Sequence, residues 1–454
     1  MLAALPWTAR AEEGPYSNFL VGERSMGLGG AFVAVADDVS ALFHNPSGLA
    51  SLSTSAYSGG LWAFFEGRRR IENGYRTDLG AVSLEHSATL AIPSFLGGVV
   101  KFGKRTEDGV RPHALGAALM SPFVNEYRFV AQLNEDTAAV DRIEVRHADS
   151  ARWLGVSYAY RLRPGLAFGI TVFGAQRSVT HDEVELRARE GTTDVPAGAN
   201  IARASTVDIS AYQMIVRLGA HVDLAQELRA GVMFQPPGLD VGGSATAEYA
   251  KATTGDPMSP MTAVDLLRDD DVGYNLPTPW ELRMGLGYLA HGGELISIDL
   301  SIFGPAGSED DPQPLIDDST IEYGLFVPRK TYRRPALRGA IGFEAELTEV
   351  TPVRGGIFFE RSSAAEVLSS DTRYVRERVD RVGVALSVGI RTGGYDFAIG
   401  SSATLGTGEA LAPVREEPFG EVGYVATDVR DMRIMVFIGG GNHAVRQLVK
   451  SVFE

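Results

Sequence analysis

Hydrophobic and polar residues alternate with a period of two along most of the chain. In residues 295–303, isoleucine and leucine occupy the even positions, whereas Ser297, Asp299 and Ser301 occupy odd positions. In residues 382–390, valine, leucine and isoleucine alternate in the same way with glycine, alanine and serine. A period of two is that of a β-strand whose two faces meet different surroundings. The pattern therefore predicts an all-β protein.

Fourteen segments carry this alternation and are predicted as strands. They lie near 56–65, 88–102, 113–133, 138–161, 165–188, 203–224, 226–250, 272–290, 293–303, 333–347, 351–363, 376–392, 394–405 and 421–439. Tight turns are expected at 161–165, 223–227, 290–294, 346–350 and 391–395, and long polar connections at 236–279 and 304–328. An even number of strands joined by short turns and long loops is typical of bacterial outer-membrane barrels.

The sequence leaves the direction of the apolar faces open. In a soluble β-sandwich these faces form the core, whereas in a membrane barrel they meet lipid and the polar faces line the lumen. Glycine favours the barrel, because 52 of the 454 residues are glycine, against a usual ~7%, and many lie within strand-like segments. No stretch of about 18 uninterrupted apolar residues occurs, so any membrane crossing is predicted to use strands.

Charge and cysteine content narrow the possible functions. The formal net charge is −15 and the chain has no cysteine. Nucleic acid and anionic membrane surfaces both require clustered lysine and arginine, and the basic runs at 68–70 and 329–330 are too short to provide them. No nucleic-acid partner is expected. Without cysteine there is no disulfide, thiolate metal site or thiol nucleophile, which agrees with an oxidising envelope compartment.

Residues 22–50 differ from the strand segments. They contain three closely spaced glycines, Gly27, Gly29 and Gly30. These glycines allow a tight turn and close backbone packing. Asp37 or Asp38 is predicted to cap a short helix through Phe43, which Pro46 ends. A nucleotide-binding loop is disfavoured, because no apolar strand precedes the glycines and no Gly-Lys-Ser/Thr follows them.

Two motifs in this segment carry a family resemblance: Gly22-x-Arg24-x-Met26-Gly27-x-Gly29-Gly30-Ala31 and Asn45-Pro46-Ser47. They resemble the N-terminal hatch of the FadL-type outer-membrane transporters of hydrophobic compounds, whose hallmark is Asn-Pro-Ala. Ser47 stands where the family usually has alanine. Residues 273–300 are similar to a proline-led hairpin of the same family. The resemblance implies an all-β, 14-stranded antiparallel transmembrane β-barrel whose lumen the hatch plugs from the periplasmic side.

Pro122 interrupts the predicted third strand, where it removes a hydrogen-bond donor. In the family, a kink in the third strand makes a lateral exit into the membrane, and the resemblance implies the same role here. The chain end departs from the family, whose barrels finish on an aromatic residue. Residues 441–454 instead show the pattern of a short amphipathic helix. The expected organisation is a signal-peptide remnant (1–11), a hatch (12–54), a barrel (55–440) and this C-terminal helix.

Motifs for catalysis or metal binding are missing from the sequence. The eight histidines show no ligand spacing, and no Gly-x-Ser-x-Gly occurs. Neither a metal nor a cofactor is expected, and the protein is not expected to be an enzyme. Two alternatives stay open: a lipid hydrolase assembled across strands, and a divalent cation held by Asp269, Asp270 and Asp271, although a solvated acidic loop is the simpler interpretation of those residues.

A hydrophobic solute requires an apolar pocket with a few polar groups. The candidates for the pocket are Phe32, Val33 and Phe43 in the hatch and Met233 and Phe358 in the barrel. Three arginines of inward parity, Arg217, Arg283 and Arg354, are candidates to neutralise a carboxylate. The alternative for each arginine is a salt bridge within the lumen to Asp299, Glu344 or Asp396.

The predicted function is passive transport of long-chain fatty acids or other hydrophobic small molecules across a Gram-negative outer membrane. The solute would pass through the plugged barrel and leave laterally, and membrane lipid would surround the barrel. The alternative is an outer-membrane scaffold or shuttle for secretion or surface assembly, which would bind a protein partner. A continuous apolar path and an opening near Pro122 favour transport, because a scaffold requires neither.

Overall fold

The computed structural model describes residues 21–442, except 136–137, 192–197, 256–262, 292, 308–312, 318–323, 330, 369–370, 372, 393 and 417–419. The helical elements are α1 (Glu23–Gly27), α2 (Ala41–His44) and the 3-10 helix η1 (Pro46–Ser51). The strands are β1 (Ala56–Thr77), β2 (Gly80–Phe102), β3 (His113–Glu135), β4 (Ala139–Arg163), β5 (Leu166–Arg189), β6 (Ala199–Asp223), β7 (Leu228–Gln235), β8 (Leu239–Thr254), β9 (Ala263–Asp269), β10 (Gly273–Tyr274), β11 (Glu281–Leu289), β12 (Leu295–Phe303), β13 (Ile316–Asp317), β14 (Ala336–Thr348), β15 (Thr351–Glu360), β16 (Arg378–Thr392), β17 (Tyr395–Arg415) and β18 (Gly423–Asn442).

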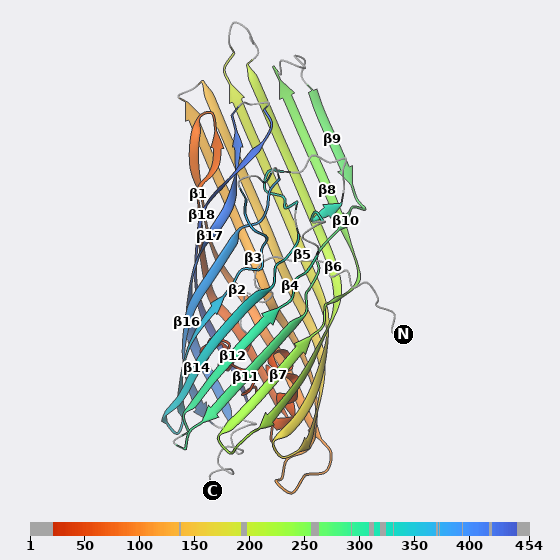
Figure 1. The fold of residues 1–454 in the computed structure, drawn as a ribbon, viewed down its shortest axis with the longest axis vertical. Helices are drawn as coiled ribbons and strands as arrows, with labels where there is room; N and C mark the ends of the chain where they lie inside the picture. Colours follow the sequence, from red (N-terminus) through yellow and green to blue (C-terminus); the bar gives the residue numbers. More distant parts are fainter. Residues whose placement is uncertain are drawn as a thin grey trace.

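The long strands form one closed antiparallel barrel (Figure 1). Most strands pair with their neighbours in the chain, while β6 pairs with both β7 and β8. The pairing of β1 with β18 and of β5 with β6 completes the circle through β7 and β11. Within the described residues this sheet contains sixteen strands. The predicted count of fourteen is therefore not confirmed, because the segment predicted as one strand at 226–250 is divided into β7 and β8, and β9 lies in the predicted loop 236–279.

The apolar faces of the strands point outward and the polar faces point inward. On β16, Val382 and Leu386 are 58% and 64% exposed, whereas on β12 Ser297 and Asp299 are 0% and 5% exposed. A β-sandwich would bury the first pair and expose the second, so the structure is a barrel of the membrane type. None of the helices in the described part of the chain is long and apolar enough to cross a membrane.

The two ends of the barrel differ. The predicted tight turns at 161–165, 223–227, 290–294, 346–350 and 391–395 all connect strands at one end, called here the short-turn end. The other end, called here the long-loop end, is where the strands that flank the connections 190–198, 255–262, 304–335 and 361–377 end. Figure 1 shows the red N-terminal helices inside the barrel near the short-turn end, at the bottom of the view. The predicted signal-peptide remnant and the predicted C-terminal helix fall almost wholly outside the described residues.

Candidate functional site

Residues 21–52, called here the N-terminal segment, lie inside the barrel. Almost all of them are buried. The 3-10 helix η1 packs against β3 to β6, and α1 packs against β15 to β18. The segment therefore touches opposite parts of the wall and crosses the lumen near the short-turn end.

Two carboxylates of the barrel wall hold the first half of the segment in place. The Asp299 carboxylate on β12 accepts hydrogen bonds from the backbone N–H groups of Phe32 and Val33, at 2.7 and 2.8 Å. The Arg24 guanidinium donates to Glu344 on β14 at 2.8 Å and pairs with Asp37 within the segment. Buried backbone donors require partners, and here a carboxylate of the wall supplies one for two of them.

The Asn45-Pro46-Ser47 tripeptide is a second attachment point. The Asn45 amide donates to the carbonyl oxygens of Val33 and Ala220, at 2.9 and 3.1 Å. The Ser47 hydroxyl donates to Asn45 Oδ1 at 2.7 Å and lies 3.1 Å from Nδ1 of His221 on β6. Alanine at position 47 could make neither contact, so the departure from the family tripeptide adds a polar link between the segment and the wall.

Glycines allow the segment and the wall to approach each other closely. Gly29 and Gly30 have φ angles of 64° and 91°, which only glycine adopts readily. Gly27 has no such φ angle, but a Cβ there would meet Ser387 of β16. On the wall, a Cβ at Gly231 would meet the backbone of Val33. Close packing of the N-terminal segment against the wall therefore depends on glycine at these positions, and their role in a hatch stays a prediction.

The predicted helix cap differs in detail. The helix α2 begins after Ser40, and the carboxylate of Asp38 accepts hydrogen bonds from the Ser40 backbone N–H and hydroxyl. The side chain of Asp37 pairs with Arg24 instead. Neither aspartate therefore caps the helix directly. The helix ends at His44, two residues before Pro46.

The three predicted arginines all face the lumen and all have carboxylate partners. Arg354 donates to Glu344 at 2.7 Å and lies 3.8 Å from Asp396, as the salt-bridge alternative proposed. Arg217 and Arg283 both pair with Glu281 on β11, a partner that the sequence analysis did not name. Arg217 also stacks on Phe43, with its guanidinium carbon 4.0 Å from the ring centroid.

The predicted pocket residues do not all meet. Phe32 and Phe43 belong to one large buried apolar cluster. Phe358 packs separately with Ala31 and Ala340. Met233 is buried on β7, and Val33 is buried near Gly285 on the wall. The pocket candidates are thus distributed over several parts of the interface between segment and barrel.

The large cluster includes barrel residues that the sequence analysis missed. They are inward-facing and mostly aromatic: Phe95, Met120, Phe123, Trp153 and Phe173. The ring centroids of Phe43 and Trp153 are 5.9 Å apart, and those of Trp153 and Phe173 are 5.2 Å apart. The available signal was an aromatic residue at a position of polar parity, which an all-polar lumen would not require.

The wall is interrupted next to this cluster. Strand β2 pairs with β3 only from Phe95 opposite Met120 to Phe102 opposite His113. Beyond Met120, the described pairing of β3 continues with β4 alone, after a register shift between Met120 and Phe123. Pro122 lies in this shift. The missing ladder between residues 80–94 of β2 and 121–135 of β3 is called here the β2–β3 gap.

One side chain bridges the β2–β3 gap. The imidazole Nδ1 of His86 on β2 accepts a hydrogen bond from the Arg128 backbone N–H on β3 at 2.8 Å. A side chain thus satisfies a backbone donor that a neighbouring strand would normally satisfy. Asn45 and Ser47 of the N-terminal segment do not take part in this bridge, since they bond Val33, Ala220 and His221.

A cavity of about 950 Å³ lies between the N-terminal segment and the short-turn end. Its lining combines apolar residues, such as Val35, Leu52 and Leu289, with charged ones, such as Arg161 and Asp396. Among the described residues, no three histidine, aspartate or glutamate side chains are arranged to hold a metal ion. In the predicted acidic loop, Asp270 pairs with Arg268, and Asp269 accepts a hydrogen bond from the Asp271 backbone.

Comparison with known proteins rests on structure. No protein-family model and no curated protein sequence matches the chain. A FadL homologue of Pseudomonas aeruginosa matches with a TM-score of 0.63 and 11% identity, over 96% of this chain and 99% of that chain.

Two toluene transporters match over similar lengths. TodX of Pseudomonas putida gives a TM-score of 0.59 at 13% identity, over 93% of this chain and 98% of that chain. TbuX of Ralstonia pickettii gives 0.53 at 14% identity, over 93% and 97%. At such identities the likeness establishes the architecture. The fold of this chain is therefore that of the FadL-type outer-membrane transporters of hydrophobic compounds.

Proposed function

We propose that the protein carries apolar small molecules across a Gram-negative outer membrane, with the N-terminal segment as its plug and the β2–β3 gap as a lateral exit. The observation that carries the proposal is the position of the gap. It opens beside a buried apolar cluster that includes Met120, Phe123 and Trp153. A solute held by these side chains would leave the lumen without passing the N-terminal segment into the cavity at the short-turn end.

The structure supports a plug because the N-terminal segment is buried and is attached to opposite parts of the wall. Its contacts with Asp299, Glu344 and His221 are hydrogen bonds and ion pairs. A polar lumen can satisfy an irregular backbone that lipid could not. This arrangement leaves the route toward the short-turn end closed and favours a sideways path.

An uncharged solute fits the lumen better than a carboxylate does. Arg217, Arg283 and Arg354 are each paired with a carboxylate of the protein. A fatty acid would have to displace one of these partners and leave it unpaired, which is costly for a buried charge. The neighbours TodX and TbuX are described as toluene transporters. We therefore place aromatic or aliphatic hydrocarbons ahead of fatty acids as substrates.

Uptake by whole cells tests the proposal. Cells that express the protein should take up labelled toluene faster than cells with an empty vector, and labelled fatty acid should show a smaller gain. Equal uptake with and without the protein would exclude transport of these compounds and favour the scaffold alternative, which then predicts a co-purifying protein partner.

Replacing Pro122 tests the exit. Pro122→Val restores a donor and should extend the β2–β3 pairing, so uptake should fall while folding is retained. Pro352→Val, in β15 and away from the gap, is the matched control. Heat-modified migration on a gel confirms that both variants are folded. If Pro122→Val transports as well as the parent at matched expression, the lateral exit is wrong.

A further inference from the structure

The tips of two hairpins meet inside the barrel at the long-loop end. Arg76 and Thr77 of β1 pair in parallel with Val414 and Arg415 of β17. Lower in the barrel β18 separates these strands, since it pairs with both β1 and β17. One edge of β17 is occupied by β18 up to the pair Val414–Gly423. The opposite edge of β17 pairs with β16 only as far as Glu409 and is free beyond that residue. It is this free edge that β1 joins. To reach that edge, β1 must cross the face of the β17–β18 hairpin.

Burial shows that this crossing is on the lumen side. Tyr75 and Leu84 of the β1–β2 hairpin and Leu411 of β17 are all 0% exposed. They share an apolar cluster with inward-facing residues of β3 and β4, among them Phe129 and Val145. The tips of the β1–β2 hairpin (71–84) and of β17–β18 (410–416 and 420–429) therefore cover the lumen, and are called here the entrance lid.

Residues of a long connection lie beneath the lid. The Glu183 carboxylate on β5 accepts hydrogen bonds from the backbone N–H groups of Leu325 and Phe326, at 2.6 and 2.9 Å. Tyr424 of the lid donates its hydroxyl hydrogen to the Leu325 carbonyl at 2.9 Å. The lid thus contacts residues 325–326, which are themselves bound to β5 on the opposite side of the barrel.

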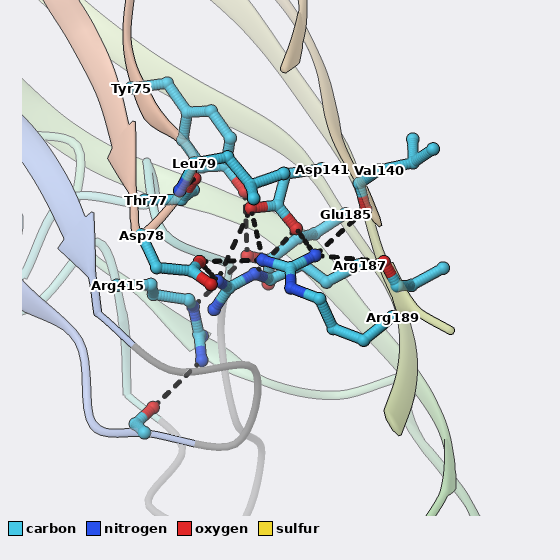
Figure 2. A network of polar contacts seen from close by, with 12 residues as sticks. Tyr75, Thr77, Asp78, Leu79, Val140, Asp141, Glu185, Arg187, Arg189 and Arg415 are labelled. Atoms are coloured by element: carbon cyan, nitrogen blue, oxygen red, sulfur yellow. Dashed lines mark hydrogen bonds and ion pairs between the residues drawn. The ribbon is translucent and has the colours of Figure 1, made fainter. Parts of the chain in front are cut away.

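Ion pairs fasten the lid across the mouth. Figure 2 shows Asp78, at the turn of the β1–β2 hairpin, facing Arg187 and Arg189 at the end of β5. Both guanidinium groups lie 2.7 Å from Asp78 Oδ1. In the wall, β1 and β5 are four strand spacings apart, about 19 Å along the sheet. Asp78 can reach these arginines only because the hairpin leans across the lumen.

The ion pairs of Asp78 with Arg187 and Arg189 are called here the latch. Other carboxylates hold the two arginines of the latch in place. Asp141 on β4 accepts hydrogen bonds from Arg187 and Arg189, at 3.0 and 2.8 Å. Arg415 of the lid lies 3.1 Å from Glu185 on β5, which also accepts from the Tyr75 hydroxyl at 3.3 Å. Loss of Asp78 would therefore weaken the attachment of the lid to β5 without leaving Arg187 and Arg189 as unpaired buried charges, while the contacts of Arg415 and Tyr75 with Glu185 remain.

The β1–β2 hairpin also has the freedom to move. Residues 80–94 of β2 share no described ladder with β3. Register shifts interrupt the pairing of β1 with β2 between Gly60 and Leu61 and between Trp62 and Phe65. A hairpin that is detached on one side and irregular at its base can rotate more easily than a strand paired on both edges.

We propose that the entrance lid is a gate for the lumen, closed in this structure by the ion pairs of Asp78 with Arg187 and Arg189. Its use for substrate entry rests on the proposed transport function. The gate itself does not, because the latch and the covered lumen are properties of the fold. Opening requires Asp78 to leave both arginines, Arg415 and Tyr75 to leave Glu185, and the lid residues to leave the apolar cluster.

Thiol labelling tests the gate without any transport measurement. The chain has no cysteine, so Ala131→Cys, beneath the lid on β3 and 3% exposed, gives a single reporter. Its reaction with a membrane-impermeant maleimide should be slow in the otherwise unchanged protein. Adding Asp78→Asn should speed the reaction about tenfold, which corresponds to a shift of about 1.4 kcal/mol in the opening equilibrium.

The matched control is Glu85→Gln on the outer face of the same hairpin. It removes the same charge from an exposed pair with Arg70 and should leave labelling unchanged. Equal labelling of the Asp78→Asn and Glu85→Gln proteins, both shown to be folded by heat-modified migration, would overturn the gate.

A disulfide then connects the gate to transport. Arg76→Cys with Val414→Cys joins register partners of the two tips and should lock the lid, lowering uptake until a reductant is added. Val384→Cys with Ala403→Cys, register partners in the wall, is the control and should not alter uptake. Undiminished uptake by the locked protein would exclude the lid as the entrance. A protein that takes up nothing in any form would overturn the proposed function, while the labelling result would still decide the gate.

Discussion

Asp299 is the residue whose loss should most directly release the N-terminal segment. Its carboxylate accepts the backbone N–H groups of Phe32 and Val33, and no salt bridge to it is present among the described residues. Asp299→Ala leaves two buried donors without a partner. Each such loss costs about 1–3 kcal/mol, so the pair costs about 2–6 kcal/mol.

The lower end of that range is the better estimate for this site. The cavity on the short-turn side brings water close to the segment, and removal of a buried carboxylate recovers part of its desolvation energy. A net loss of about 2 kcal/mol raises the released fraction about thirtyfold. We expect Asp299→Ala to show frequent channel openings in planar bilayers and faster proteolysis within residues 21–52.

Two further substitutions separate the possible causes. Asp299→Asn removes the charge but keeps a carbonyl oxygen that can accept the same N–H groups, so it should behave nearly as the parent. Ser297→Ala changes a buried residue of the same strand whose described hydrogen bond goes to the wall carbonyl of Leu286. This variant should also leave the channel openings and the proteolysis unchanged. If Asp299→Ala shows no more channel openings and no faster proteolysis than Ser297→Ala, the two hydrogen bonds do not hold the segment in place.

Two other substitutions test the same interface. Gly231→Val should displace the segment and raise the channel conductance, because its side chain would meet the backbone of Val33. The control is Gly174→Ala, which has open space around it. If neither variant changes the conductance, the expected clash is wrong. Ser47→Ala should lower the midpoint of heat modification by an amount equivalent to about 1 kcal/mol, because it removes the hydroxyl between Asn45 and His221; an unchanged midpoint would show that this hydroxyl adds nothing to stability.

The strand pattern was predictable because alternation is local. The outward direction of the apolar faces was not predictable, since a period of two is the same for a sandwich and a barrel. The observed strands depart from the predicted segments at Pro236-Pro237-Gly238, where two residues without an N–H end β7 and let the chain continue as β8. Below this point β7 pairs with β11, and above it β8 pairs with β9. A single apolar pattern cannot show that the partner strand changes.

The sequence predicted which side chains of the site face the lumen, but not which residues they bond. The inward direction of Arg217 and Arg354 followed from alternation, and the structure confirms it. The bond from Asp299 to Phe32 joins residues 267 positions apart, and no local pattern carries that information. The upper half of β1 was missed because the charged run Glu66 to Arg70 interrupts the apolar alternation. Those residues belong to the taller part of the wall, where the outer face carries exposed charged residues such as Arg68 and Arg70.

The gap in the wall and the lid over the lumen follow from one displacement. The hairpin that leaves the wall to place Asp78 beside Arg187 is the same hairpin whose β2 no longer pairs with β3 beyond Met120. If the hairpin returned to the wall, residues 80–94 of β2 would lie beside residues 121–135 of β3 and would narrow the gap. If the proposed gate and the proposed lateral exit are both correct, they cannot be open at the same time in this geometry. A solute would then enter while the wall is closed and leave after the lid has closed behind it.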